Sequence, residues 1–255
     1  MEFAFVSVPA APVRRKPAHS KEMVNQLLFG EAVRILGTKG DLWVRVQSLH
    51  DLYEGWITSS MLTPIDEKTA NSKIDFTTRD LLSEITMEGS SVNITPGASL
   101  PGWNGGKGLL GKLAYDFNGN IIERDKQVPS SALVTSISRA WLNVPYLWGG
   151  RTILGADCSG FVQVVCKMMG IDLLRDASQQ ALEGKPVPKF KERIAGDLAF
   201  FESKGSITHV GILLENEQII HSSGKVKIDH LDKKGIVDMV TGKRIQKLEC
   251  IRRYW

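Results

Sequence analysis

The sequence predicts a multidomain protein in which small all-β domains precede an α+β domain. Upstream of Val128, short β-branched runs alternate with Gly- and Asp-containing turns, which is typical of small barrels. After Cys158, apolar residues recur at three- and four-residue steps, as on one buried face of a helix. Further on, two short aliphatic runs flank the polar segment Glu215-Asn216-Glu217 and predict a hairpin.

The first elements of the chain are predicted to be strands. The apolar run Phe3–Val13 is interrupted by two prolines and has no basic segment before it, so it resembles a strand more than a signal peptide. The segment Ile74–Pro129 gives weaker strands around Gly102–Gly111, and the polar stretch Asp66–Lys73 is expected to be a linker. Three further strands are predicted upstream of this linker, each bounded by Gly or Asp. They are Glu31–Leu36, Leu42–Val46 and Glu54–Thr58.

Composition places the chain among ordinary globular proteins. The 255 residues are 42% hydrophobic, and no window approaches the eighteen or so uninterrupted apolar residues of a membrane span. Three cysteines do not make a disulfide framework, so we expect reduced thiols and a cytoplasmic protein, or a periplasmic one if a leader was trimmed. The positive excess, +4 over the whole chain, lies in residues 129–255, where it suits an acidic peptide substrate or is simply a solvated surface. Basic runs lack interleaved aromatics, so no nucleic-acid partner is expected, and a monomer is predicted.

Cys158 stands where the predicted helix begins. A thiol at a helix N-terminus feels the positive end of the peptide dipoles, which favours the nucleophilic thiolate. Asp157 and Ser159 beside it are short polar residues suited to a cap or first turn. We expect Cys158 to face solvent and to carry little packing. Cys166 and Cys250 are interpreted as inert core residues.

Two histidines complete a possible catalytic group. His209 and His221 lie six residues on either side of Glu215, so a hairpin centred there would make them direct cross-strand neighbours. One imidazole would then accept the thiol proton of Cys158 while the other orients it. A Cys/His/His zinc site is the alternative, although a fourth ligand and a metal-type spacing are missing.

Five segments in sequence resemble the NlpC family of cell-wall cysteine peptidases, and the resemblance extends from about Val128 to the C-terminus. They are Pro145-Tyr-Leu-Trp-Gly-Gly150, Asp157-Cys-Ser-Gly160, Gly196-Asp-Leu-Ala-Phe200, His209-Val-Gly and His221-Ser-Ser. The resemblance implies a papain-like α+β fold and cleavage of bacterial wall peptides, usually after D-glutamate. It also implies that Cys158 is the nucleophile, His209 the base and His221 the third member.

Upstream, Gly30-Glu31, Trp43-Val-Arg-Val46 and Gly55-Trp-Ile57 resemble a bacterial SH3-like domain. The predicted domains are therefore 1–68 and 69–128, two SH3-like barrels of which the second is divergent, followed by the catalytic domain 129–255. This order is similar to that of γ-D-glutamyl-diamino-acid endopeptidases. In those enzymes the first SH3-like domain helps to form a pocket for a free N-terminal L-alanine.

Such a pocket needs acceptors for a buried ammonium group. Asp157 and Ser159, beside the nucleophile, are candidates for a carboxylate and a hydroxyl. Glu22 and Tyr53 are the candidates from the first domain, although a surface glutamate and a barrel-packing tyrosine are the competing interpretations.

Three further residues are candidates for substrate contact. Tyr146 and Trp148 either line the pocket or are structural aromatics, and Tyr146 is also a candidate donor to the oxyanion. Arg175 is a candidate for the α-carboxylate of D-glutamate, in competition with nearby acidic residues.

The predicted reaction is acyl transfer to Cys158 followed by hydrolysis, with no cofactor. The backbone N–H of Cys158 is expected to stabilise the oxyanion. Two alternatives remain open. One is an amidase or acyltransferase with the same three residues, and the other is a non-catalytic protein that binds wall peptides.

Overall fold

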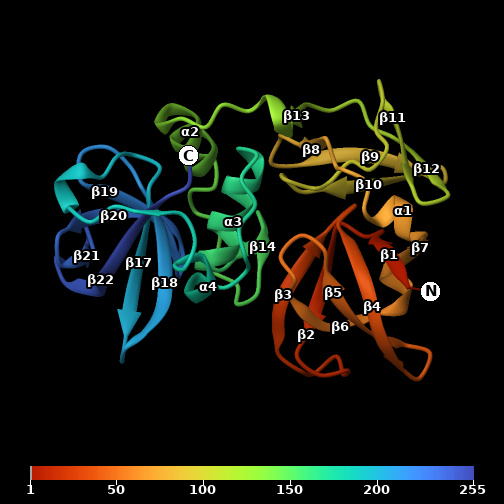
Figure 1. The fold of residues 1–255 in the computed structure, drawn as a ribbon, viewed down its shortest axis with the longest axis horizontal. Coiled ribbons are helices and arrows are strands. Elements are labelled where there is room, and N and C mark those ends of the chain that lie inside the picture. The colour runs from red at the N-terminus through yellow and green to blue at the C-terminus, as the bar shows by residue number, and fades with distance from the viewer. Residues whose placement is uncertain (1) are drawn as a thin grey trace. The chain divides into compact units, whose positions relative to one another are not determined.

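The structure is a computed structural model that describes residues 2–255, and it is mostly β with few helices (Figure 1). It divides into two compact units. The N-terminal unit comprises the chain up to Gln127 together with Trp148–Thr152, and the C-terminal unit comprises Val128–Leu147 and Ile153–Trp255. The unit boundary lies next to the expected start of the catalytic domain. The five-residue return of the chain to the N-terminal unit was not expected.

The N-terminal unit begins with a seven-stranded antiparallel sheet in the order β3-β2-β6-β5-β4-β1-β7. Alternate aliphatic side chains of these strands form one buried cluster that includes Val13, Val46 and Ile57. The predicted strands are confirmed, except that the run Phe3–Val13 makes two strands, because the chain turns between them at Pro9. The strands are β1 (Phe3–Val6), β2 (Ala10–Arg14), β3 (Met23–Leu28), β4 (Ala32–Lys39), β5 (Trp43–Ser48), β6 (Glu54–Thr58) and β7 (Leu62–Ile65).

The remainder of this unit holds a four-stranded sheet, β10-β9-β12-β11, and the pair β13-β8. Its core includes Ile85, Leu110 and Tyr115 together with Phe5 and Phe29 from the first sheet region. The reading of residues 69–128 as a separate SH3-like domain stays a prediction. The elements are β8 (Phe76–Thr78), β9 (Ser83–Met87), β10 (Ser90–Ile94), β11 (Lys107–Leu110), β12 (Leu113–Asp116), β13 (Ile121–Glu123) and β14 (Arg151–Thr152).

The expected linker Asp66–Lys73 is partly helical. Its helix α1 (Glu67–Ala70) is capped by the Asp66 side chain, which accepts a hydrogen bond from the Thr69 N–H at 2.7 Å. The short helix forms because Asp66 is a good N-cap residue, and the role of this stretch as a linker stays a prediction. Short 3-10 turns lie elsewhere in the chain, at Ser59–Met61, Arg124–Lys126 and Phe190–Glu192.

The C-terminal unit is built on an antiparallel sheet that closes on itself. Strand β22 pairs with both β17 and β21, so the order β22-β17-β18-β19-β20-β21 forms a barrel with β16 at its edge. Phe201, Leu213, Ile219 and Leu231 are among the side chains buried in its core. The strands of the C-terminal unit are β15 (Gly155–Ala156), β16 (Lys185–Pro186), β17 (Leu198–Ser203), β18 (Ser206–Leu213), β19 (Gln218–Ser223), β20 (Lys225–Asp232), β21 (Gly235–Val237) and β22 (Arg244–Arg253). All of them except β15 belong to this sheet.

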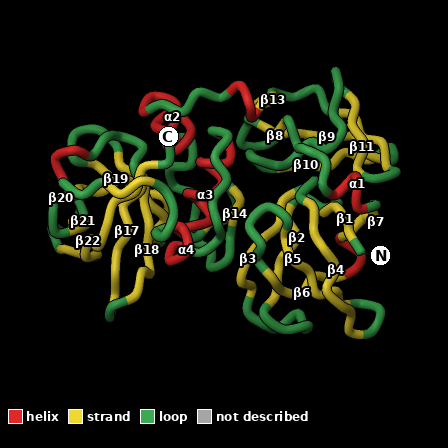
Figure 2. Tube along the Cα trace, viewed as in Figure 1, coloured by secondary structure: helices red, strands yellow, loops and turns green. Residues whose placement is uncertain are grey.

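Three helices accompany this barrel, and Figure 2 shows how short the helical segments are relative to strands and loops. They are α2 (Ser131–Arg139), α3 (Cys158–Met168) and α4 (Ala177–Gln180). The papain-like label for this arrangement stays an interpretation. No helix within residues 2–255 is both long and apolar enough to cross a lipid bilayer.

Helix α3 positions the predicted nucleophile. It begins at Cys158, as predicted, because the Asp157 side chain accepts a hydrogen bond from the Gly160 N–H at 2.7 Å and caps the helix. The helix packs against β18, β19, α2 and α4. All of its residues are buried, including Gln163 and Lys167, so the expectation of a single buried face was wrong.

Candidate active site

Cys158 lies at the first position of α3 and is buried, with only 7% of its surface exposed. The expectation of a solvent-facing residue was therefore wrong. The backbone N–H groups of Val210 and Ser159 hydrogen-bond to its side chain and favour the thiolate. Burial acts in the opposite sense and is the largest effect, followed by the charge of Asp157, and together they raise the pKa of the thiol to about 11. Because burial outweighs the helix N-terminus, the resting side chain is a thiol.

His209 on β18 and His221 on β19 are brought together. His209 Nε2 lies 2.8 Å from His221 Nδ1, and the two rings meet edge to face with centroids 5.0 Å apart. Both rings share a sheet face with the core residues Leu213 and Ile219, since side chains two residues apart point to the same side. Val210, which bonds the thiol of Cys158, directly follows His209.

The register of the hairpin differs from the predicted one. Asn216 and Glu217 both have positive φ, 56° and 58°, and the pairs Ile212–Ile220 and Leu213–Ile219 centre the turn on Asn216 rather than Glu215. His221 therefore lies opposite Gly211, and His209 is its diagonal neighbour. A Cβ on Gly211 would stand 2.9 Å from the Cβ of His221, so glycine at this position leaves room for the histidine side chain.

A fourth residue, Asp229, hydrogen-bonds to the histidine pair and was not predicted from the sequence. Asp229 on β20 is 2% exposed, and its Oδ2 lies 3.0 Å from His221 Nε2. Its only signal in the sequence is a carboxylate two residues before Leu231, a core position of the same strand face. A buried acidic residue at such a position needs a hydrogen-bond partner.

The hydrogen bonds that link Asp229, His221 and His209 determine which ring nitrogens carry a proton. An ionised carboxylate only accepts, so His221 Nε2 carries a proton that it donates to Asp229. Neutral His221 then accepts at Nδ1 from His209 Nε2–H. This arrangement leaves a lone pair on His209 Nδ1, the form that a general base needs.

Both imidazoles are neutral at rest. Burial is the main effect that lowers the pKa of His209, to about 3, and the charges of His221 and Lys227 add to it. Burial also lowers the pKa of His221, although the hydrogen bond and charge of Asp229 oppose it. The resting pair is thus thiol and imidazole.

Asp157, Ser159 and Arg175 form a buried cluster beside Cys158. Arg175 donates to both carboxylate oxygens of Asp157, at 3.0 and 2.6 Å, and to Ser159 Oγ at 2.9 Å. Asp157 and Arg175 were predicted to take an ammonium and a carboxylate of the substrate. The structure pairs these two charges with each other, and their contacts with substrate stay predictions.

Tyr146 lies close enough to Cys158 and Asp157 to interact with them electrostatically. Its N–H donates to Gly224 O at 2.9 Å, and the next residue, Leu147, donates to Ala156 O at 3.3 Å. Burial first, then the charges of Cys158 and Asp157, raise the pKa of Tyr146 to about 12. The phenol therefore stays protonated near neutral pH and keeps an O–H to donate.

The other aromatic candidate, Trp148, belongs to the N-terminal unit, and so do Glu22 and Tyr53. The Trp148 indole N–H donates to Glu22 Oε1 at 2.9 Å, and Arg15 pairs with the same carboxylate at 2.7 Å. Tyr53 lies in the turn before β6, where its N–H donates to Asp51. The structure thus joins Glu22 to Trp148, and the substrate roles of all three stay predictions.

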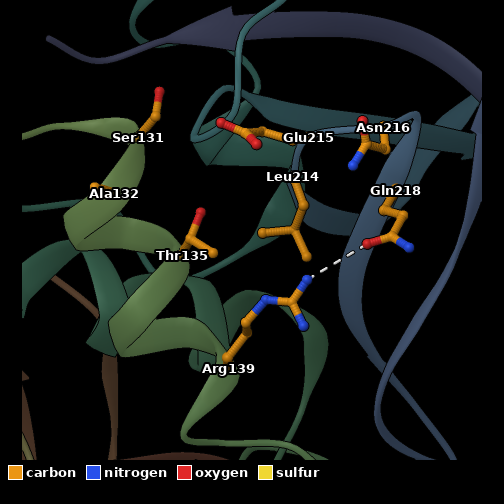
Figure 3. A pocket seen from close by; sticks show the side chains of 8 residues that line it. All are labelled: Ser131, Ala132, Thr135, Arg139, Leu214, Glu215, Asn216 and Gln218. Atoms are coloured by element: carbon orange, nitrogen blue, oxygen red, sulfur yellow. Dashed lines mark hydrogen bonds between the residues drawn. The ribbon is translucent and has the colours of Figure 1, made fainter.

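Among residues 2–255, the predicted catalytic residues form no metal site and do not line the cavity beside α2. Within residues 2–255, no group of three or more His, Cys, Asp and Glu side chains is arranged to hold a metal ion. A shallow cavity of about 230 Å³ lies between α2 and the β18–β19 turn, where Arg139 reaches toward Gln218 (Figure 3). None of the predicted catalytic residues lines it.

Comparison with known proteins gives two matches along the chain. Residues 143–245 match the NlpC/P60 family, and residues 13–62 match the bacterial dipeptidyl-peptidase Sh3 domain. The chain is 32% identical over 225 residues to a gamma-D-glutamyl-L-lysine dipeptidyl-peptidase of Bacillus subtilis (strain 168), covering 77% of this chain and 71% of the relative. It is 28% identical over 265 residues to a protein of the same name from Bacillus cereus, covering 89% and 76%.

Among solved structures, an NlpC/P60 family protein from Bacillus cereus ATCC 10987 has the same fold. The TM-score is 0.84 over 99% of each chain, at 23% sequence identity.

Proposed function

The chain belongs to the NlpC/P60 family of cysteine peptidases, and we propose that it hydrolyses γ-D-glutamyl–diamino-acid bonds in small peptides from bacterial cell walls. The observation that supports this substrate most is the match to the two Bacillus dipeptidyl-peptidases, which extends over both kinds of domain. The proposed role is the recycling of wall peptides that carry a free N-terminal L-alanine.

In the proposed mechanism, Cys158 attacks the γ-carbonyl carbon of D-glutamate while its thiol proton passes to His209 Nδ1. The carbonyl π pair moves to oxygen, where the Cys158 N–H and the Tyr146 hydroxyl are the proposed donors. Collapse of this intermediate breaks the C–N bond, and His209 returns its proton to the leaving amine. Water, deprotonated by His209, then hydrolyses the thioester and releases the thiol.

The proposal is tested with L-Ala-γ-D-Glu-L-Lys and its diaminopimelate counterpart as substrates. The wild-type protein should release the free diamino acid, and Cys158→Ala should reduce the rate to background because the nucleophile is gone. Cys166→Ala is the matched control on the same helix. It should keep its activity and lose about 1–2 kcal/mol of unfolding free energy, as expected for a small core truncation.

An N-acetylated L-Ala substrate separates the alternatives. Acetylation removes the ammonium charge, so we expect kcat/KM to fall by at least about tenfold. Asp157, Glu22 and Tyr53 are the proposed acceptors for this ammonium group, although Asp157 is already paired with Arg175. Equal rates on both peptides would contradict the free-amine specificity. Transfer of the acyl group to an added amine would favour an acyltransferase, and binding without turnover would favour a binding protein.

A further inference from the structure

Asp229 is held from three sides on the strand behind the histidine pair. Its Oδ2 accepts from His221 Nε2 at 3.0 Å and pairs with Lys227 Nζ at 2.9 Å, and its Oδ1 accepts from the Met239 N–H at 3.0 Å. These contacts come from β19, from β20 itself and from the turn after β21. The carboxylate therefore cannot rotate away from His221 without losing other hydrogen bonds.

Lys227 links Asp229 to a second carboxylate. Its Nζ pairs with Asp238 Oδ2 at 2.7 Å, and Asp238 Oδ1 caps the following turn by accepting from the Val240 and Thr241 N–H groups. Hydrogen bonds from His221, Met239 and Lys227 outweigh burial and lower the pKa of Asp229 to about 2. The group carries two negative charges and one positive, so an excess negative charge remains next to the histidines.

We propose that Asp229 is a positioning residue that fixes the tautomer of His221 and, with Lys227 and Asp238, stabilises the imidazolium formed on His209. The inference rests on the proposed role of His209 as base. As His209 Nδ1 takes the thiol proton, the new positive charge is shared along the His209–His221 hydrogen bond toward Asp229. No proton needs to reach the carboxylate for this effect.

The first variant is Asp229→Asn, which keeps the shape and removes the charge. An amide can donate to His221 Nε2 and so favour the wrong tautomer. We expect kcat to fall on the order of 100-fold with KM changed less than about twofold, because orientation of the base matters in the transition state. Asp232→Asn is the matched control on the same strand. Asp232 pairs with Arg244 at 2.7 Å and should leave the rate unchanged when mutated.

The pH profile of kcat/KM distinguishes positioning from a purely structural role. The charged groups around the two neutral imidazoles are Lys227, Asp229 and Asp238. Removing the Asp229 charge destabilises imidazolium, so the acid limb of Asp229→Asn should move to lower pH. Lys227→Gln removes a nearby positive charge, so its acid limb should move to higher pH.

Opposite shifts of the two variants support the proposal, and unshifted profiles overturn it. If Asp229→Asn does not fold, Lys227→Gln decides alone, since the Lys227 side chain is 25% exposed and the variant is expected to fold. Nitrogen NMR of the histidines in Cys158→Ala tests the tautomer without turnover. A proton on His221 Nδ1 instead of Nε2 would contradict the proposal even if the peptidase activity is as proposed.

Discussion

At the scale of single residues, the side chain of Cys158 is a neutral thiol in the resting site. The raised pKa of Cys158 and the lowered pKa of His209 share one cause, the burial of both side chains. Charge separation between them is unfavourable until a substrate supplies a carbonyl and compensating donors. Activation by a base at the moment of attack fits this environment better than a preformed thiolate–imidazolium pair.

Alkylation of Cys158 by iodoacetamide should report this state. Since the thiolate is the reactive form, the rate should rise roughly tenfold per pH unit until the pH approaches the thiol pKa of about 11. Peptide mass spectrometry resolves the rate for Cys158. Cys166, which is 1% exposed, is the internal control and should not react in the folded protein. A plateau below pH 7 would instead indicate a preformed ion pair.

At this scale, part of the candidate site could be predicted from the sequence. The start of the helix at Cys158 and its cap at Asp157 were predicted correctly, and the two histidines beside the turn do meet, while their catalytic roles stay predictions. The direction of the thiol pKa was predicted wrongly because the helix-dipole argument takes no account of burial. Asp229 was missed because its neighbour in space, His221, is on another strand, and a strand pattern does not reveal which polar residue pairs across it.

At the scale of elements, the turn of the β18–β19 hairpin sets the geometry of the histidines. A sequence shows that a polar turn is present, but its centre depends on which residues adopt left-handed conformations. Here Asn216 and Glu217 do so, which moves the turn centre by one residue and the strand register by two. Diagonal rather than opposite histidines are the result, with Gly211 across from His221.

Gly211→Ala should test this arrangement. The added Cβ would meet the Cβ of His221 at 2.9 Å and the Cδ1 of Ile219 at 2.8 Å, so the histidine must shift. We expect kcat to fall on the order of 100-fold, as for a small misplacement of a catalytic group, with about 1–3 kcal/mol lost from the unfolding free energy. Gly37→Ala is the control, because an added Cβ there meets nothing within 4 Å. Full activity of Gly211→Ala would contradict the close packing.

At the scale of the whole molecule, a short segment just before the nucleophile belongs to the N-terminal unit. In Trp148–Thr152, Gly149 has a φ of 75° and lies against the backbone of β3, where a Cβ would stand 2.8 Å from Met23 O. Arg151 is fully buried and donates to both oxygens of Glu31, at 2.8 and 3.0 Å. This pair could not be predicted from the sequence, because its members are 120 residues apart.

Glu31→Gln should destabilise the protein strongly. It leaves the Arg151 charge buried without its carboxylate, a change that costs about 3–5 kcal/mol in other proteins. Urea unfolding measures the loss, and Glu31→Gln combined with Arg151→Met should recover part of it. Glu54→Gln is the control, since its partner Arg45 is half exposed and such pairs contribute less than about 1 kcal/mol. Equal losses at the two sites would show that burial of the first pair is energetically unimportant.

The order in which the chain is synthesised determines when the Arg151–Glu31 pair can form. Ribosomal synthesis proceeds from the N-terminus, so every strand of β1–β13 is synthesised before Arg151 is added. Until then the Glu31 carboxylate lacks its guanidinium, and the N-terminal unit lacks β14. Its last stabilising contact therefore arrives with the residues that immediately precede Cys158. The N-terminal unit can therefore be completed only once the chain has been synthesised up to the residues just before α3.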